Sequence, residues 1–187
     1  YRYLFLMLTY LYLPVRGRVH RSMGGHPKTW VVINTTANIG DMVCTTPIFR
    51  AIKERTPDAR IIVVGIPRNG ILLLHAPYVD RYISSKQSPF ALVRELRKEG
   101  IDARVMINFS MLEFAFLFLA RVPHISCFVY TLGKLTTTRS YQAVSWMGDH
   151  VAYTPGVYVP GQYLNLLRPF GIHNTDIRKH LGYSDEG

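Results

Sequence analysis

Short apolar runs alternate with amphipathic segments along most of this chain. The apolar runs predict strands at residues 30–33, 60–65, 79–83, 103–108, 125–129 and 150–153. The segments between them predict helices at about 40–55, 71–75, 89–99, 111–120 and 158–170, with a loop over 130–148. Strands that alternate with helices at this spacing indicate crossover units. We therefore expect an α/β fold with a Rossmann-like, doubly wound parallel sheet.

The first predicted helix contains a proline. Its apolar positions repeat at helical spacing and should face the sheet: Cys44, Ile48, Ala51 and Ile52. Pro47 has no amide proton to donate, so the helix should either kink there or become regular only after Thr46.

Residues 1–27 are expected to form an arm and a linker that precede the globular part. The run 3–13 is apolar all round, and a basic segment follows it at 16–21. A membrane span needs about 20 residues, so the run is too short to cross a bilayer by itself. It is either an interfacial helix whose basic flank meets anionic lipid, or the end of a span that begins upstream, or a helix packed on the domain.

The charge of the chain favours anionic partners. Its 22 Lys and Arg residues against 12 Asp and Glu residues give a net charge of +10, and no acidic residue precedes Asp41. Phospholipid head groups or a phosphorylated glycolipid fit this charge. Nucleic acid fits less well, because no binding motif accompanies the charge. Cys44 and Cys127 are the only cysteines, and they lack the spacing of a metal site, so we expect two core thiols in a reducing cytoplasm and no metal or cofactor.

The segment from Asn34 to Pro47 carries the candidate chemistry. It joins the first strand to the first helix and places Asp41 at the helix start, at the carboxyl edge of the sheet, where α/β proteins bind ligands. Gly40 is expected to permit a tight turn and the close approach of a ligand. A carboxylate at this place is a candidate general base, although it could equally be a helix cap. The chain contains no GxGxxG after the first strand, no P-loop and no HExxH or GxSxG motif.

Several stretches, in order, resemble glycosyltransferase family 9, the lipopolysaccharide heptosyltransferases. They are Ile39-Gly40-Asp41-Met42-Val43, Thr45-Thr46-Pro47, Pro57-Asp58-Ala59-Arg60-Ile61, Ala76-Pro77-Tyr78-Val79-Asp80, Ile101-Asp102-Ala103 and Tyr163-Leu164-Asn165-Leu166-Leu167. The resemblance covers about residues 28–175 and implies the N-terminal, acceptor-binding half of a GT-B enzyme. Residues 176–187 would then begin the linker to a donor-binding domain, which this chain does not include.

The resemblance also implies a mechanism and a set of site residues. Asp41 matches the family's catalytic aspartate, the general base of an inverting transfer that needs no metal. Thr36 and Asn38 could donate hydrogen bonds to substrate, Gly40 lies beside them, and Lys86 stands where the family has basic acceptor-binding residues. The chain departs from the family at Thr35, where many members carry Arg or Lys, and at Ala37, where many carry Asp or Ser.

From these observations we expect a heptosyltransferase-like enzyme at the inner face of the cytoplasmic membrane. It would transfer a sugar from a nucleotide-sugar such as ADP-heptose to a lipopolysaccharide core or a related anionic glycolipid. The 187-residue chain alone should be inactive. Two alternatives stay open: a non-catalytic, membrane-tethered Rossmann-like module, and a GT-B transferase for another sugar or acceptor.

Overall fold

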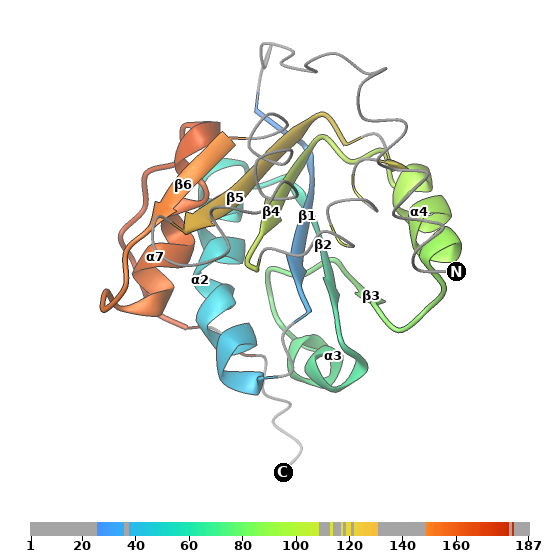
Figure 1. The fold of residues 1–187 in the computed structure, drawn as a ribbon, viewed down its shortest axis with the longest axis horizontal. Helices are drawn as coiled ribbons and strands as arrows, with labels where there is room; N and C mark the ends of the chain where they lie inside the picture. The colour runs from blue at the N-terminus through green and yellow to red at the C-terminus, as the bar shows by residue number, and fades with distance from the viewer. Residues whose placement is uncertain are drawn as a thin grey trace.

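The computed structural model describes residues 26–35, 38–108, 113, 117, 119–120, 122–130, 149–179 and 181. Within them, six strands form one sheet in the order β3-β2-β1-β4-β5-β6, and every neighbouring pair is parallel. The strands are β1 (Thr29–Asn34), β2 (Arg60–Gly65), β3 (Arg81–Ser84), β4 (Ala103–Met106), β5 (His124–Tyr130) and β6 (Asp149–Tyr153). This arrangement confirms the expected doubly wound parallel sheet, and Figure 1 shows it.

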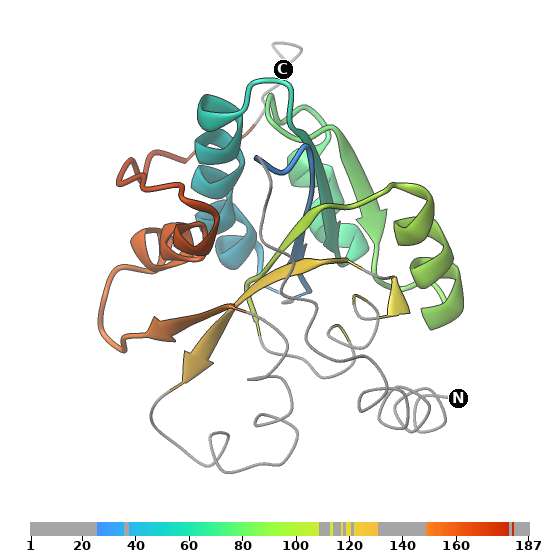
Figure 2. The same ribbon diagram turned by 90° about the horizontal axis from the view of Figure 1, so that it is seen from above.

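Helices cover the sheet on both sides, which explains the unbroken apolar runs of its central strands. On one side Trp30 and Val32 of β1 pack with residues of α2 (Ile39–Arg55) and α7 (Val159–Asn165). On the other side Val31 and Ile33 pack with residues of α4 (Pro89–Lys98). Figure 2 shows the two layers with the sheet between them.

Two aspartates in the family-like stretches secure the amino edge of the sheet. The Asp102 carboxylate accepts hydrogen bonds from the amides of Lys28 and Thr29, each at 3.0 Å. The Asp80 carboxylate accepts one from the Ile61 amide at 2.7 Å. Both carboxylates therefore hold strand ends together at the edge opposite Asp41.

The helix α3 (Pro67–Leu73) begins four residues earlier than the sequence pattern predicts. Pro67 occupies the first turn, where a missing amide proton costs nothing and the fixed φ of proline already suits a helix. The bounds of most strands also differ by one or two residues from the prediction; the largest differences are at β3, which begins at Arg81 rather than at 79, and at β4, which ends at Met106 rather than at 108.

The prediction of one helix over residues 158–170 is wrong. α7 ends at Asn165, and a separate 3₁₀ helix, η3 (Arg168–Phe170), follows it. Pro169 has no amide proton to donate to the carbonyl four residues earlier, so the α-helical hydrogen-bond pattern is interrupted there. Before it, the amides of Leu166 and Leu167 already donate to carbonyls three residues earlier, at 3.1 and 3.0 Å, which is the 3₁₀ pattern. Gly171, with φ of 73°, ends the segment.

α2 is helical on both sides of Pro47, so the expectation of a helix regular only after Thr46 is wrong. The Thr46 hydroxyl donates to the Val43 carbonyl at 2.9 Å, the carbonyl that Pro47 leaves without an amide. The expectation of two core thiols holds for Cys127, which is 1% exposed, but Cys44 is only partly buried.

Several predictions fall outside the described residues. They concern the arm at 1–25, Thr36, the loop at 131–148 and most of the helix at 111–120, of which Glu113, Leu117 and Leu119 are helical. Among the helices that the structure describes, none combines the length and the apolar character that a bilayer crossing requires.

Candidate active site

The candidate site lies where the strand order reverses, between β1 and β4. From β1 the chain winds outward through β2 and β3, whereas β4, β5 and β6 extend the sheet on the other side. Adjacent crossovers leave in opposite directions at such a point and open a crevice at the carboxyl ends of the strands. β1 ends there at Asn34, and α2 begins five residues later.

Asp41 lies in the first turn of α2, three residues after the N-cap residue Asn38. Its side chain is partly exposed, and the Asn38 side-chain amide donates to its carboxylate at 3.3 Å. Among the described residues we find no backbone amide bound to this carboxylate. The carboxylate is partly exposed at the carboxyl edge of the sheet, as a general base at a ligand site must be.

Hydrogen bonds connect the end of β1 to the same helical turn. The Asn34 side chain, which is 0% exposed, donates to the Thr45 hydroxyl at 2.9 Å. That hydroxyl donates to the Asp41 carbonyl at 2.8 Å. Three buried or half-buried groups thus fix the position of the Asp41 backbone relative to the sheet.

Gly40 does not form the tight turn expected of it. It is the second residue of α2, and it is not among the glycines with positive φ. A Cβ atom added there would meet nothing within 4 Å, so its surroundings are open. The close approach of a ligand at Gly40 stays a prediction.

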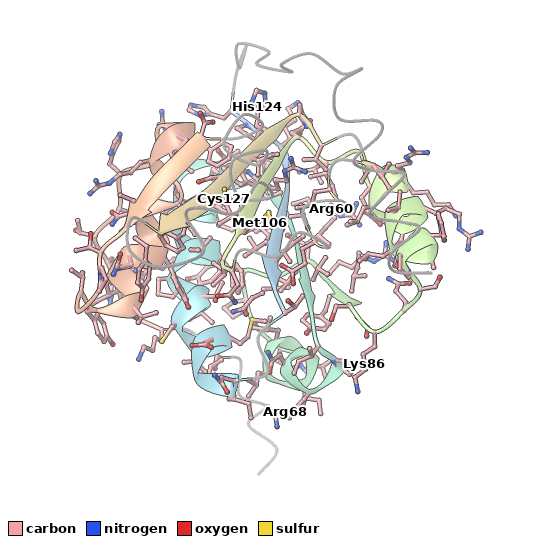
Figure 3. All side chains as sticks on the ribbon, viewed as in Figure 1. Arg60, Arg68, Lys86, Met106, His124 and Cys127 are labelled. Atoms are coloured by element: carbon pink, nitrogen blue, oxygen red, sulfur yellow. The ribbon has the colours of Figure 1, made fainter. Side chains whose placement is uncertain are left out.

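Lys86 lies at the same edge of the sheet but apart from Asp41. It follows β3, and its amide donates to the Ser84 hydroxyl at 3.3 Å. β3 is two strands from β1, which corresponds to about 10 Å. Its side chain is exposed, and in the view of Figure 3 it projects toward the end of the molecule where α3 lies.

Glu113 is a site residue that the sequence analysis missed. It accepts a hydrogen bond from the hydroxyl of Thr35, the first residue after β1. Its side chain is 6% exposed, and burial raises its pKa from the ordinary 4.5 to about 8. The only signal in the sequence is one acidic residue inside the apolar run 111–120.

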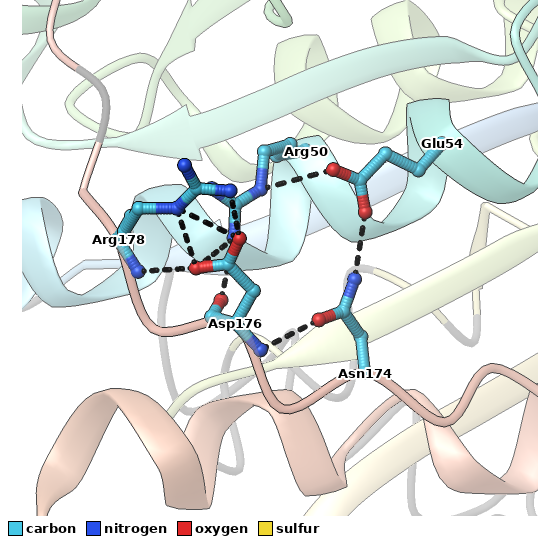
Figure 4. A network of polar contacts seen from close by, with 5 residues as sticks. All are labelled: Arg50, Glu54, Asn174, Asp176 and Arg178. Carbon is cyan, nitrogen blue, oxygen red and sulfur yellow. Dashed lines mark hydrogen bonds and ion pairs between the residues drawn. The ribbon is translucent and has the colours of Figure 1, made fainter.

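The segment 172–179 lies along α2 and contacts it first near its C-terminal end. Arg50, which is 3% exposed, donates to the backbone carbonyl of Asp176 at 2.7 Å and forms an ion pair with the Asp176 carboxylate, also at 2.7 Å. The Asn174 side-chain amide donates to the Glu54 carboxylate at 2.8 Å (Figure 4). The hydrogen bonds from Arg178 hold the pKa of the Asp176 carboxyl well below its usual range. This network fixes the segment along α2.

Lys179, near the end of this segment, acts on Cys44 of α2, three residues after Asp41. Burial, the largest effect, raises the pKa of the Cys44 thiol. The positive charge of Lys179 lowers this pKa, and the negative charge of Asp41 raises it. The ammonium of Lys179 and the carboxylate of Asp41 therefore both act on Cys44. The Lys179 ammonium also lies 5.6 Å from the centre of the Tyr158 ring.

In the part of the chain that the structure describes, no group of three or more His, Cys, Asp or Glu side chains is arranged to hold a metal ion. Among the described residues, the switch point of this doubly wound α/β domain carries the partly exposed Asp41 carboxylate and the buried Glu113 carboxyl group.

Comparison with known proteins gives matches in structure alone. No family model matches the sequence, and no curated protein matches it. A glycosyl transferase of family 9 from Veillonella parvula superposes with a TM-score of 0.61 at 16% identity, over 80% of this chain and 42% of that chain. The ADP-heptose lipopolysaccharide heptosyltransferase II of E. coli gives 0.64 at 18% identity, over 84% of this chain and 47% of that one.

The E. coli heptosyltransferase WaaC with ADP-2-deoxy-2-fluoro heptose gives a TM-score of 0.62 at 12% identity, over 80% of this chain and 51% of that one. The chain thus spans about half the length of these enzymes. At such identities the likeness establishes the fold, and it confirms the resemblance to the N-terminal portion of heptosyltransferases.

Proposed function

We propose that this chain is the acceptor-binding half of a glycosyltransferase of the heptosyltransferase type. The similarity to three solved transferases supports a glycosyltransferase-like function. The observation that carries the proposal is the Asp41 carboxylate, partly exposed in the first turn of α2 at the switch point. A donor-binding domain would complete the crevice in the full-length protein.

In the proposed reaction Asp41 is the general base. The acceptor hydroxyl loses its proton to the carboxylate, and its oxygen bonds to the anomeric carbon of the donor. The bond from that carbon to the diphosphate oxygen breaks, and the nucleoside diphosphate leaves with inversion at carbon. Asn38, Gly40, Lys86 and Thr36 would bind the substrates; Thr36 lies outside the described residues.

The proposed donor is a nucleotide-sugar such as ADP-heptose. Two of the similar structures hold ADP or an ADP-heptose analogue, which supports this choice. The proposed acceptor is an anionic glycolipid such as a lipopolysaccharide core, which suits the net charge of +10.

We also propose that the protein works at the inner surface of the cytoplasmic membrane. Ile71 and Leu74, one helical turn apart at the end of α3, are 76% and 74% exposed. Arg68 and His75 are exposed beside them, and residues 66–79 contain no acidic side chain. Exposed aliphatic side chains beside Arg68, in a stretch without acidic residues, suit an anionic lipid surface.

The test is a transfer assay on the full-length protein with labelled nucleotide-sugars. Asp41→Asn should lower turnover by at least about a hundredfold, the scale of general base catalysis. Asp58→Asn, the same change at an exposed position just beyond the other end of α2, should have no effect. The isolated chain should transfer nothing.

Two results would replace the proposal with an alternative. Wild-type protein that binds nucleotide-sugar or lipid without transfer would indicate a non-catalytic module. Transfer of another sugar, with ADP-heptose inert, would indicate a related transferase of different specificity.

A further inference from the structure

The chain that leads from β1 to Asp41 is held on two sides. On the α2 side, Asn34 and Thr45 connect the strand end to the Asp41 carbonyl at 2.9 and 2.8 Å. On the other side, the Thr35 hydroxyl donates a hydrogen bond to the carboxyl group of Glu113, 78 positions further along the chain. Glu113 comes seven residues after the end of β4, so this hydrogen bond crosses the switch point.

The Glu113 side chain is 6% exposed, in a segment that packs into the core. Leu117 and Ala120, from the same segment, are buried with the core cluster on the α4 side of the sheet. A charged carboxylate is costly in such surroundings, and burial is the cause of the raised pKa of about 8. At neutral pH the group is therefore mostly the neutral acid, whose carbonyl oxygen can still accept from Thr35.

We propose that Glu113 is a positioning residue for the sugar transfer, which holds Thr35 and thereby fixes the chain that carries Asp41. This inference rests on the proposed function. Only five residues separate Thr35 from Asp41, and Asp41 must meet an acceptor hydroxyl at hydrogen-bond distance. A displacement of about 1 Å can cost on the order of a hundredfold in rate.

A neutral acid suits this role better than a carboxylate. Under the proposed function the crevice receives a nucleoside diphosphate group and an anionic acceptor. A second carboxylate at the switch point would repel both. A neutral carboxyl group supplies the hydrogen-bond acceptor without adding negative charge.

The experiment compares four variants of the full-length protein in the transfer assay. Thr35→Val and Glu113→Leu remove the donor and the acceptor, and each should lower kcat by about tenfold or more with KM for the donor within about threefold. Thr35→Ser and Glu113→Gln keep a hydroxyl and a carbonyl oxygen, so both should retain kcat within about threefold. The double variant Thr35→Val/Glu113→Leu should be no slower than the slower single variant, because both remove one interaction.

Three kinetic results would overturn the proposal. Glu113→Gln could be as slow as Glu113→Leu, which would make the carboxyl group a proton carrier. Alternatively, Thr35→Val could be as fast as wild type, or the losses in kcat could multiply in the double variant. Backbone amide NMR signals of Asn38 and Asp41 supply a second measurement that needs no activity. They should shift in Thr35→Val and stay in Thr35→Ser, and unshifted signals in Thr35→Val would refute the positioning role. If the wild-type protein transferred no sugar, the proposed function would be refuted. The NMR signals of Asn38 and Asp41 would still decide whether Glu113 positions this part of the chain.

Discussion

The buried carboxyl group of Glu113 predicts a specific dependence of stability on pH. The pKa of Glu113 is about 8 in the folded protein against an ordinary value of 4.5, and its side chain is 6% exposed. Between these two values the folded state holds a proton that the unfolded state has released. The free energy of unfolding must therefore fall as pH rises through this window. Glu113→Gln keeps the shape of the side chain and removes the titration.

The size of the effect follows from the width of the window. A difference of one pKa unit corresponds to about 1.4 kcal/mol. From pH 5.5 to 7.5, wild type should lose roughly 2 to 3 kcal/mol relative to Glu113→Gln. The raised thiol pKa values of Cys44 and Cys127 affect stability only at higher pH, and Cys127 titrates near 11. The carboxyl of Asp176, whose pKa is lowered, stays ionised in the whole window.

The assay is urea denaturation at several pH values, followed by the fluorescence of tryptophan, to which the fully buried Trp30 contributes. The difference in unfolding free energy between Glu113→Gln and wild type should grow steadily in favour of the variant as pH rises. Two curves that stay parallel from pH 5.5 to 7.5 would refute the assignment of Glu113 as a neutral acid.

The remaining predictions concern two glycines and the α3 surface. Gly65→Ala should lower the free energy of unfolding by about 1 to 3 kcal/mol, because the added Cβ would lie 2.8 Å from a backbone oxygen of β1. Gly40 has open space around it, so Gly40→Ala should keep or raise the free energy of unfolding in the same urea assay. If substrate approaches Gly40 closely, Gly40→Ala should nevertheless raise KM, and an unchanged KM would remove Gly40 from the site. Ile71→Ser/Leu74→Ser should weaken sedimentation with phosphatidylglycerol vesicles by about tenfold or more. Phe90→Ser, a control at a 56% exposed position on α4, should leave vesicle binding unchanged. Equal losses of vesicle binding in both variants would contradict a docking role for α3.

The sequence predicted the sheet well because its strands are buried on both faces. Runs such as Trp30–Ile33 and Ile61–Val64 have no polar side chain, so few other structures suit them. The bounds of the helices were harder to predict, because they depend on hydrogen bonds rather than on apolar spacing. Pro67 starts α3 early, and Pro169 divides the last predicted helix.

The candidate site was predictable where its parts are local in sequence. Asn38 and Asp41 are three residues apart, and the strand, loop and helix pattern alone places them at the carboxyl edge of the sheet. Contacts between distant residues gave no such signal. Thr35 meets Glu113 78 positions away, and Arg50 is buried on α2 because Asp176 pairs with it from 126 positions away.

The proposed function depends most on the proton transfer assigned to Asp41. The most direct measurement is the single-turnover rate of sugar transfer by the full-length Asp41→Asn variant, with donor and acceptor both saturating. If Asp41 is the general base, this rate should be at least about a hundredfold below that of wild type. Dissociation constants for both substrates should stay within about threefold of wild type, because the amide keeps the size of the side chain. A single-turnover rate equal to that of wild type would contradict the proposed function.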